Sequence, residues 1–418
     1  MEESNCERDH QAHVQEDSAS DYRCVPVLRF RGFTYAWERQ RLGELIFECT
    51  QRTSDFAQYP LHSLTIENGV TEKTERYERG FLVTKEEDLF KIVPPKYFVT
   101  NPMNLRFGAI GCNQKSYNVS VSGYYDVFSI DDRKCSEFWL AYLKTHTALK
   151  KYDDVATGSL IEKRRVHFSE LKKIDFLAPA DSEEKQKIGD YFENLDRLVA
   201  LHQRKLTKLH TIKKALLEKM FPTPGSTIPE IRFRGFTETW ELHKVGDFLT
   251  ESQIRGNTGL EAKKLTVKLR GKGVVEKNDV GGSEHTRYFI RRKGQFIYSK
   301  LDFLNAAFGV IPENLDTYES TADLPAFDLD GMNPYFMLFT ATQKNFYLKH
   351  GSIADGSRKA KRIHTDTFLN MPITVPTIDE QNFVVSCFQY LDSLATLHQH
   401  KLNKLHCIKK ALLEKMFV

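Results

Sequence analysis

The segment IKKALLEKMF occurs twice in this chain without a single difference, at Ile212–Phe221 and at Ile408–Phe417. It is the end of a longer repeat, because residues 188–221 and 384–417 agree at 22 of 34 positions. The two copies are offset by 196 residues, and the second copy reaches nearly to the last residue of the sequence. The chain therefore closes each of its halves with the same segment.

A second repeat opens each half. Residues 25–45 and 228–248 share the run RFRGFT and a tryptophan, Trp37 or Trp240, with an offset of 203 residues. We call residues 25–45 and 228–248 the opening segments. Two copies are too few for a solenoid, so the pattern predicts one unit built twice, with pseudo-twofold symmetry inside one chain.

The closing repeats have the periodicity of long amphipathic helices. Apolar residues and one histidine recur at a heptad spacing in both copies, at Ile188, Leu195, His202, Leu209 and Leu216, then at Val384, Leu391, His398, Leu405 and Leu412. Four residues after these positions follow Phe192, Val199, Leu206 and Met220, and in the second copy Phe388, Ala395, Leu402 and Met416. At roughly 1.5 Å per residue, such a helix is on the order of 50 Å long. Its apolar stripe needs a partner, and the matching stripe of the other copy predicts an antiparallel pair.

Between the repeats, each half has the composition of a mixed globular domain. Short aromatic and β-branched segments such as KYFVTN, YDVFSI and QFIYSK, bounded by Gly, Pro and Asn, indicate strands. The predicted fold class is therefore α+β: two mixed α/β domains joined by a pair of long antiparallel, coiled-coil-like helices. RFGAIG (106–111) resembles AFGVIP (307–312), but the two middles otherwise differ widely.

Composition excludes several classes of protein. No apolar run approaches 18 residues, which argues against a membrane span. Seven scattered cysteines, none in a C-x-x-C pair, favour a reducing cytoplasm and argue against a zinc site. Residues 1–24 are polar and acidic and are predicted to be a disordered tail.

The sequence contains no convincing catalytic constellation. No G-x-x-x-x-G-K-[ST] motif for nucleotide phosphates occurs, and no pair of carboxylates with a lysine is evident in a strand context. NPYF (333–336) is similar to a methyltransferase base-binding motif, but it lacks the second proline and a preceding glycine-rich turn. His202 and His398 match across the repeat, and packing within a helical interface is a better explanation for them than a metal site.

Basic segments with glycine, serine and aromatic residues favour a nucleic-acid partner, because cations and backbone amides approach phosphates closely. Arginine can also bind a guanine edge with two hydrogen bonds. The predicted DNA contacts are Lys96, Arg106, Lys115, Tyr124, Arg164, Arg165, Lys268, Arg270, Lys272, Arg287, Arg291, Arg292, Lys300, Ser357, Arg358, Lys359 and Arg362. The loops GSLIEKRR and GSRKAKR lie at corresponding places in the two halves.

The opening motif P-x-[IL]-R-F-x-G-F-x-x-x-W and the closing KKALLEKMF resemble those of type I restriction–modification specificity subunits. The resemblance covers about residues 25–418 and implies the division 25–184 (first target-recognition domain), 185–221 (spacer helix), 222–227 (linker), 228–379 (second target-recognition domain) and 380–418 (second spacer helix). It implies a non-enzymatic chain in the cytoplasm, whose domains each read one half of a split double-stranded DNA site. The helices would set the gap between the two halves.

The same resemblance implies protein partners. Two methyltransferase subunits and translocase–nuclease subunits would supply the chemistry, using S-adenosylmethionine, ATP and Mg²⁺, while this chain binds no cofactor and no metal. The residues predicted to pair the helices or dock partners are Leu195, Leu206, Leu209, Leu216, Met220, Leu391, Leu402, Leu405, Leu412 and Met416. A stand-alone nuclease or methyltransferase with divergent motifs, and a structural coiled-coil adaptor, stay as alternatives.

Overall fold

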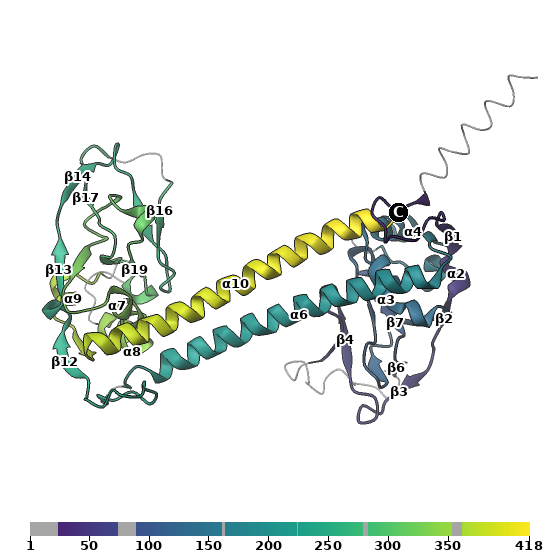
Figure 1. Ribbon diagram of the computed structural model, residues 1–418, viewed down its shortest axis with the longest axis horizontal. Coiled ribbons are helices and arrows are strands. Elements are labelled where there is room, and N and C mark those ends of the chain that lie inside the picture. The colour runs from purple at the N-terminus through teal and green to yellow at the C-terminus, as the bar shows by residue number, and fades with distance from the viewer. Residues whose placement is uncertain (1–23, 74–88, 161–163, 224, 279–282, 353–361) are drawn as a thin grey trace, which may run out of the picture. The chain divides into compact units, whose positions relative to one another are not determined.

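The computed structural model describes residues 24–73, 89–160, 164–223, 225–278, 283–352 and 362–418 (Figure 1). The predicted tail at 1–24 lies, except for Cys24, outside these residues. The chain forms two compact units. Unit 1 comprises residues 1–203 and 400–418, and unit 2 comprises residues 204–399.

Each unit contains the same four antiparallel sheets, so the mixed α/β prediction is confirmed. In unit 1 the sheets are β2 (Ile46–Glu48), β10 (Asp126–Ile130), β7 (Phe98–Thr100) and β8 (Ile110–Cys112); β3 (Arg52–Thr53), β6 (Phe90–Val93) and β9 (Val119–Val121); β4 (His62–Thr65) and β5 (Gly69–Glu72); and β1 (Glu38–Arg41) and β11 (Asp175–Ala178). Its short helices are α2 (Leu42–Leu45), α3 (Ser136–Tyr142), α4 (His146–Val155) and α5 (Phe168–Leu171).

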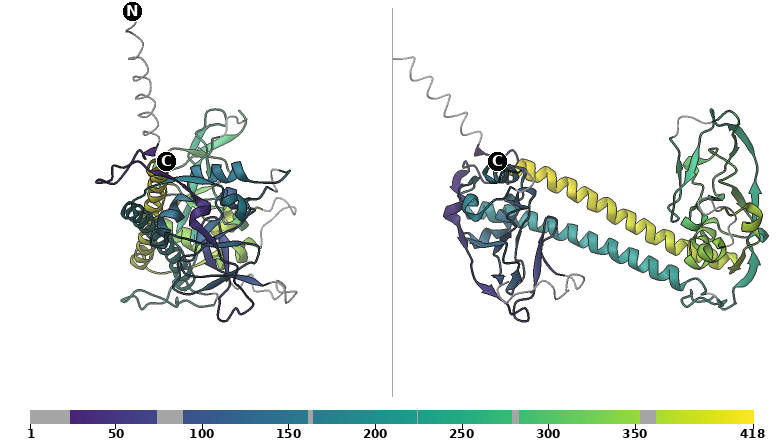
Figure 2. Two further views of the ribbon diagram at one scale, coloured as in Figure 1. Left: turned by 90° about the vertical axis from the view of Figure 1, so that its right-hand side faces the viewer. Right: turned by 180° about the vertical axis from the view of Figure 1, so that it is seen from behind.

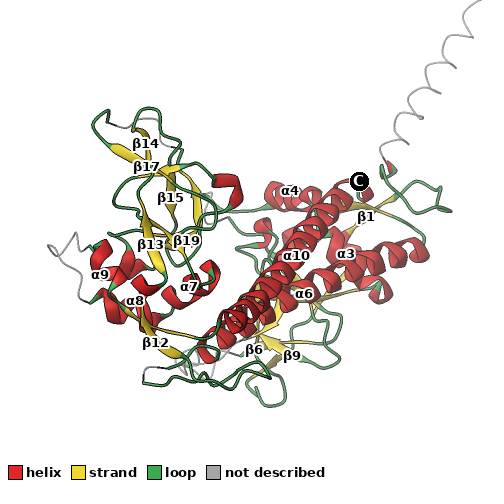
Figure 3. Ribbon diagram, turned by 60° about the vertical axis from the view of Figure 1, so that its left-hand side comes forward, coloured by secondary structure: helices red, strands yellow, loops and turns green. Residues whose placement is uncertain are grey.

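Unit 2 repeats this order of strands within each sheet. Its strands are drawn in yellow and its helices in red in Figure 3. Its sheets are β13 (Leu249–Ser252), β21 (Ala326–Leu329), β18 (Phe296–Tyr298) and β19 (Phe308–Val310); β14 (Arg255–Thr258), β17 (Arg287–Ile290) and β20 (Glu319–Ser320); β15 (Leu265–Val267) and β16 (Val274–Glu276); and β12 (Glu241–Lys244) and β22 (Pro372–Val375). Its short helices are α7 (Pro334–Ala341), α8 (Lys344–Gly351) and α9 (Thr365–Leu369).

The two closing repeats form the long helices α6 (Ser182–Lys219) and α10 (Ile378–Met416). Asp181 caps the start of α6 by accepting a 2.7 Å hydrogen bond from the backbone amide of Glu183, which satisfies one of the donors left free at a helix N-terminus. The helices begin two to three residues before the predicted positions 185 and 380 and end two residues before 221 and 418. Differences of this size are usual at helix ends, where capping residues rather than the apolar pattern fix the boundary.

The helices pair antiparallel within each unit, as predicted. In unit 1, Phe192 of α6 packs against Phe417 at 5.6 Å between ring centroids, and one helical turn further along, Asp196 pairs with Lys409. In unit 2, the equivalent ion pair joins Lys213 to Asp392 at 2.5 Å. The side-by-side helices are visible from both sides in Figure 1 and Figure 2. The matched ion pairs favour one register of the two helices. Because they lie at the exposed edge of the apolar seam, they contribute little to the free energy of unfolding.

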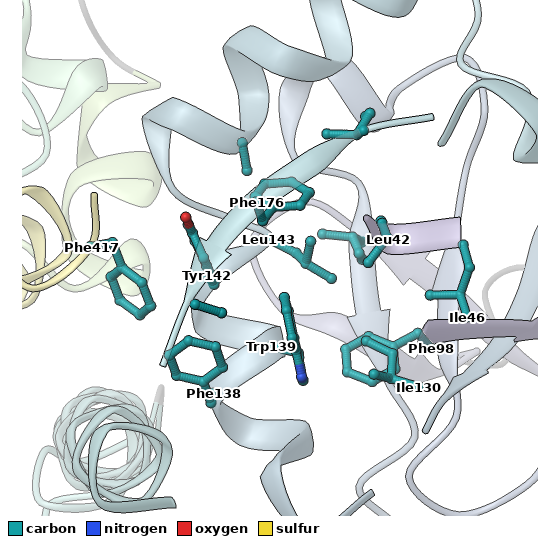
Figure 4. Close-up of a cluster of buried hydrophobic side chains, with 14 of the residues drawn as sticks. Leu42, Ile46, Phe98, Ile130, Phe138, Trp139, Tyr142, Leu143, Phe176 and Phe417 are labelled. Atoms are coloured by element: carbon teal, nitrogen blue, oxygen red, sulfur yellow. The ribbon is translucent and has the colours of Figure 1, made fainter. Parts of the chain in front are cut away.

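The repeated segment IKKALLEKMF ends inside the cores. In unit 1, Phe417 faces Tyr142 and Phe138 (Figure 4), at centroid distances of 4.8 and 5.6 Å. In unit 2, Phe221 packs on Trp240 and Phe336 at 6.0 and 5.5 Å. Each unit therefore receives the last turn of one long helix and the first turns of the other.

This exchange corrects the predicted block division of the chain. Residues 400–418 were assigned to a separate spacer helix, yet they belong to unit 1 because Met416 and Phe417 are buried in its core. In the same way, Met220 and Phe221 of the first helix complete the core of unit 2. Sequence order cannot show such an exchange, because it results from contacts between segments that are far apart in the chain.

The opening segments connect the helix ends to each unit. The amide of Leu28 donates to the carbonyl of Lys415 at 2.8 Å, and the equivalent bond from Ile231 to Lys219 is 2.9 Å long. Arg29 binds both carboxylate oxygens of Glu184, at 2.6 and 2.7 Å, and that carboxylate is 1% exposed. Arg232 and Glu380 repeat this bidentate pair in unit 2. The first arginine of the RFRGFT motif is thus explained by a buried charge pair that needs arginine geometry.

Candidate nucleic-acid interface

The two units share a loop frame that links the central strands. In unit 1, the backbone amide of Asn101 donates to the carbonyl of Ala109 at 3.1 Å, and the short helix η3 (Leu105–Phe107) lies between these two residues. In unit 2, Ser299 donates to Ala307 at 3.0 Å, across η7 (Phe303–Asn305). The residue after each short helix has a left-handed backbone conformation: φ is 90° at Gly108 and 52° at Ala306. The same hydrogen bonds hold the same loop, although the sequences differ.

This frame corrects one predicted alignment. We matched RFGAIG (106–111) to AFGVIP (307–312), but the hydrogen bonds align it with LNAAFG (304–309), three residues earlier. The shared constraint is a glycine: a Cβ atom on Gly111 would lie 2.9 Å from the backbone nitrogen of Val70, and one on Gly309 would lie 2.6 Å from Cγ2 of Val274. In both units a β-hairpin therefore packs directly on this glycine.

The two hairpins that pack on these glycines differ in charge. Between β4 and β5 the turn is Ile66, Glu67 and Asn68, whereas between β15 and β16 it is KLRGKG (268–273). Arg270 has φ 61°, and its amide donates to Asn305 in the loop frame at 3.0 Å. The side chains of Lys268, Arg270 and Lys272 are exposed. Unit 2 therefore presents three cations on a rigid turn where unit 1 presents an acid and an amide.

The two basic loops that were predicted to correspond end at equivalent places, as far as the described residues show. The amide of Val166 donates to Pro102 at 3.0 Å, and that of Ile363 donates to Lys300 at the same distance. Arg165 and Arg362, which precede these amides, therefore occupy equivalent positions. Lys300 itself is half-buried. Ser357, Arg358 and Lys359 lie outside the described residues.

Arg291 was predicted to contact DNA, and this prediction is wrong. The residue is 1% exposed, and its guanidinium donates to Ser320 Oγ at 2.7 Å and to the carbonyls of Ser252 and Leu324 at 2.8 and 3.1 Å. Burial lowers its pKa to about 10, and the nearby charge of Glu251 offsets this effect only in part. Arg291 instead joins three backbone segments of unit 2.

Arg106 and Arg164 also have structural roles that the sequence did not reveal. The side chain of Arg106 is 11% exposed and pairs with Asp153. Arg164 donates to the carbonyls of Asp153 and Ala156 at 2.7 and 2.8 Å, which closes the end of α4. Both guanidinium groups are engaged within the protein, which argues against their contacting bases.

Several other predicted contacts are at least partly exposed, and three of them are paired within the protein. Lys96 binds Glu137, and Lys115 binds Glu72 at 3.1 Å. Burial alone would lower the pKa of Lys96, but the hydrogen bond and charge of Glu137 outweigh it and the pKa is raised. Arg292 lies 3.7 Å from Asp316. Arg287 is exposed on β17, and Tyr124 is 43% exposed.

The predicted pairing residues of the helices are buried or half-buried, as a seam requires. Leu195, Met220, Leu402 and Met416 are buried, and Leu206, Leu209, Leu216, Leu391, Leu405 and Leu412 are half-buried. The sequence analysis missed a second apolar stripe beside this seam. Leu201 and Ile212 of α6 and their equivalents Leu397 and Ile408 of α10 are 36–47% exposed. Their identity in both copies was a visible signal.

The possible catalytic groups have structural partners. Asn333 of NPYF caps α7 by accepting from the amides of Tyr335 and Phe336, at 3.0 and 3.4 Å. A carboxylate–lysine cluster, which the sequence had not revealed, does exist on strands: Lys91 lies 3.8 Å from both Glu48 and Asp126. Its ammonium is largely buried and faces both carboxylates. Within the described ranges no group of three His, Cys, Asp or Glu side chains could hold a metal ion.

Comparison with known proteins identifies the class of these units. The family model described as "Type I restriction modification DNA specificity domain" matches residues 51–211. Residues 51–211 therefore form a DNA specificity domain of the type I restriction–modification family. Unit 2 repeats the fold of the matched region. No curated protein matches the sequence.

Solved structures of the specificity family resemble the chain in fold. The S subunit of a type I restriction–modification system from M. genitalium aligns with 94% of this chain and 99% of its own, at 10% sequence identity and a TM-score of 0.58. The HsdS subunit from Thermoanaerobacter tengcongensis aligns with 91% of this chain and 96% of its own, at 14% identity and a TM-score of 0.44. At such identities the residues that contact DNA have to be argued from this chain itself.

Proposed function

We propose that each unit reads one half of a split double-stranded DNA sequence. This proposal is supported by a loop frame that both units share and by the different side chains that each frame exposes. A shared frame positions the reading residues, while the chemistry of their side chains selects the bases. The turn 268–273, the arginine loops and Tyr124 supply exposed cations and an aromatic ring at this frame. Lysine contacts to phosphate would make binding strongly dependent on salt.

The long helices would hold the partners. Two identical methyltransferase subunits need two equivalent surfaces, and the exposed stripe beside the seam supplies them. Unit 1 carries Leu201 with Ile408, and unit 2 carries their equivalents Leu397 with Ile212. Exposed apolar groups at matched places on a charged helix surface are typical of a docking site. Translocase–nuclease subunits would join through the methyltransferases.

Chemistry then belongs to the partners. The chain contributes recognition and geometry, and the methyltransferase and translocase–nuclease subunits would bring S-adenosylmethionine, ATP and Mg²⁺. The capping role of Asn333, the asparagine of NPYF, supports a chain without a catalytic centre of its own. No helix among the described residues combines the length and apolar character needed to cross a bilayer. We place its action in the cytoplasm, where the DNA is accessible.

Sequencing of methylated DNA tests this proposal. The chain is co-expressed with its methyltransferase in a host that lacks adenine methylation, and the methylated positions are read by single-molecule sequencing. We expect a split motif with two specified halves, and no methylation when either protein is omitted. A motif that persists without this chain, or cleavage or methylation of DNA by the purified chain alone, would contradict the proposal.

A further inference from the structure

Three loops meet at the same place in each unit. Besides the bonds of Val166 to Pro102 and of Ile363 to Lys300, matching turns precede the strands β10 and β21. In these turns the amide of Tyr125 donates to Ser122, and the amide of Leu324 donates to Thr321, both at 3.0 Å. The residues at the tips are Tyr124 and Asp323. The frame thus places Arg165 beside Tyr124 in unit 1 and Arg362 beside Asp323 in unit 2.

Arg165 is presented to solvent by a rigid backbone. Its amide and carbonyl both bond to Thr157, at 2.8 and 2.9 Å, and its neighbour Arg164 fixes the same loop to the end of α4. The guanidinium carbon of Arg165 lies 5.8 Å from the centroid of the Tyr124 ring, and both side chains are exposed. Within the described part of the chain, this guanidinium meets no acceptor. The Tyr124 ring restricts the position of the planar guanidinium, whose N–H donors remain available to a ligand.

Arg362 is held differently at the equivalent place. Its Nε lies 3.6 Å from Oδ1 of Asp323, which is too long for a hydrogen bond, and this buried nitrogen has no acceptor among the described residues. The Asp323 carboxylate is half exposed. It therefore offers acceptor oxygens at the position where unit 1 offers an aromatic face.

We propose that Arg165–Tyr124 and Arg362–Asp323 are the base-reading pairs of the two halves, an inference that rests on the proposed function. Arg165, steadied by Tyr124, donates two hydrogen bonds to O6 and N7 of a guanine in the major groove. Asp323 accepts from the N4 amino group of a cytosine, and Arg362 offsets its charge beside the phosphates. The difference in one loop residue then gives the two halves different bases at matched positions.

The test uses the complete complex with its methyltransferase and DNA. Arg165→Lys keeps the charge and removes the two-pronged geometry. We expect its complex to lose preference for one guanine in one half-site by about tenfold to a hundredfold, while the other half-site is unchanged. The unaltered half-site reports that the protein is folded. Preference is measured by methylation of duplexes that carry each single base change.

Two further variants sharpen the outcome. Arg39→Lys changes an exposed arginine on β1 of the same unit and should leave every preference unchanged. Asp323→Tyr introduces the arginine–tyrosine pair of unit 1 into unit 2. It should change the preferred base at one position of the second half-site from cytosine to guanine. An Arg165→Lys complex that retains its full base preference overturns the assignment of Arg165, and an unaltered second half-site overturns that of Asp323. A wild-type complex that methylates no split motif instead refutes the proposed function itself.

Discussion

The recognition surfaces of the two units are the most informative comparison in this molecule. Both are built on the same loop frame, with equivalent hydrogen bonds and a glycine beneath the same hairpin. Unit 2 places Lys268, Arg270 and Lys272 on its hairpin, whereas unit 1 places Glu67 and Asn68 on its own. The frame is fixed by backbone geometry and the exposed chemistry is free to vary, which is what a pair of readers with different targets requires.

The largest expected effect is on stability, at the phenylalanine that ends the repeated segment in each unit. Phe417→Ala should destabilise unit 1 by about 3–5 kcal/mol, because it leaves a cavity in a cluster of aromatic rings. Phe417 packs on Trp37, Phe138, Tyr142 and Phe192, and Phe221 packs on Trp240 and Phe336. Phe221→Ala should therefore cost less, and the exposed Ile408→Ala should cost under about 0.5 kcal/mol. Denaturant unfolding of the full chain measures all three, and equal losses would show that the repeated segment does not anchor the cores.

The next effect is on the salt dependence of DNA binding, and it arises at the basic hairpin turn that unit 2 has and unit 1 lacks. Replacing Lys268, Arg270 and Lys272 together by glutamine should lower the slope of log affinity against log salt by about 3, one for each phosphate contact. Glu67→Gln in the hairpin of unit 1 is the matched change and should alter the slope by less than about 1. DNA-binding titrations of the methyltransferase complex between low and high salt give both values. If the triple variant has the wild-type slope, this hairpin does not contact phosphates.

A third prediction concerns the long helices, which are proposed to set the gap between the two half-sequences. Four residues inserted into each of α6 and α10 should lengthen the helices by roughly 6 Å, which corresponds to about two base pairs. The methylated motif should then keep both half-sequences and gain a wider gap. A motif whose gap stays the same would show that the helices do not set the spacing.

The smallest effect is expected at a position where the units differ by one ion pair. Lys96 and Gly294 are equivalent. The backbone amide of Lys96 donates to Asn113, just after β8, at 2.8 Å, and that of Gly294 donates to Ile311, just after β19, at 2.9 Å. Both residues have positive φ, 64° and 84°. In unit 1, Lys96 pairs with Glu137, whereas Gly294 and Tyr335 of unit 2 line a cleft of about 600 Å³. Lys96→Gly loses a partly exposed ion pair and relieves left-handed strain, so the stability at neutral pH should change by less than about 1 kcal/mol.

The same variant has a pH signature. Burial alone would raise the pKa of Glu137, but the hydrogen bonds from Lys96 and Ser136 outweigh it, so its pKa in the folded protein is lowered. A lowered carboxyl pKa stabilises the fold at neutral pH, and this stability is lost as the pH falls through the folded-state pKa. Lys96→Gly should therefore lose less stability on acidification than the wild type. Unfolding curves at neutral and acidic pH measure the difference, and Lys173→Gly, which breaks an exposed pair, serves as control.

Part of the recognition surface could be predicted from the sequence. The equivalence of the two basic loops was predicted from their composition, and the hydrogen bonds of Val166 and Ile363 place the ends of these loops at equivalent positions. The roles of individual arginines could not be predicted. Arg164 and Arg165 are neighbours of the same type, yet one closes the end of α4 and the other lies exposed over Tyr124. Arg291 lies in an equally basic segment and is buried.

The sequence by itself determined the duplication, the long helices and their apolar seam, because these depend on repeats and on a local helical period that residue order displays directly. Only the tertiary structure decided that each closing helix ends in the core of a unit, that RFGAIG aligns with LNAAFG, and which cations reach solvent. Those outcomes depend on contacts between residues far apart in the chain. A guanidinium is a reader or a structural clamp according to the acceptors that the fold brings near it, and no local pattern records them.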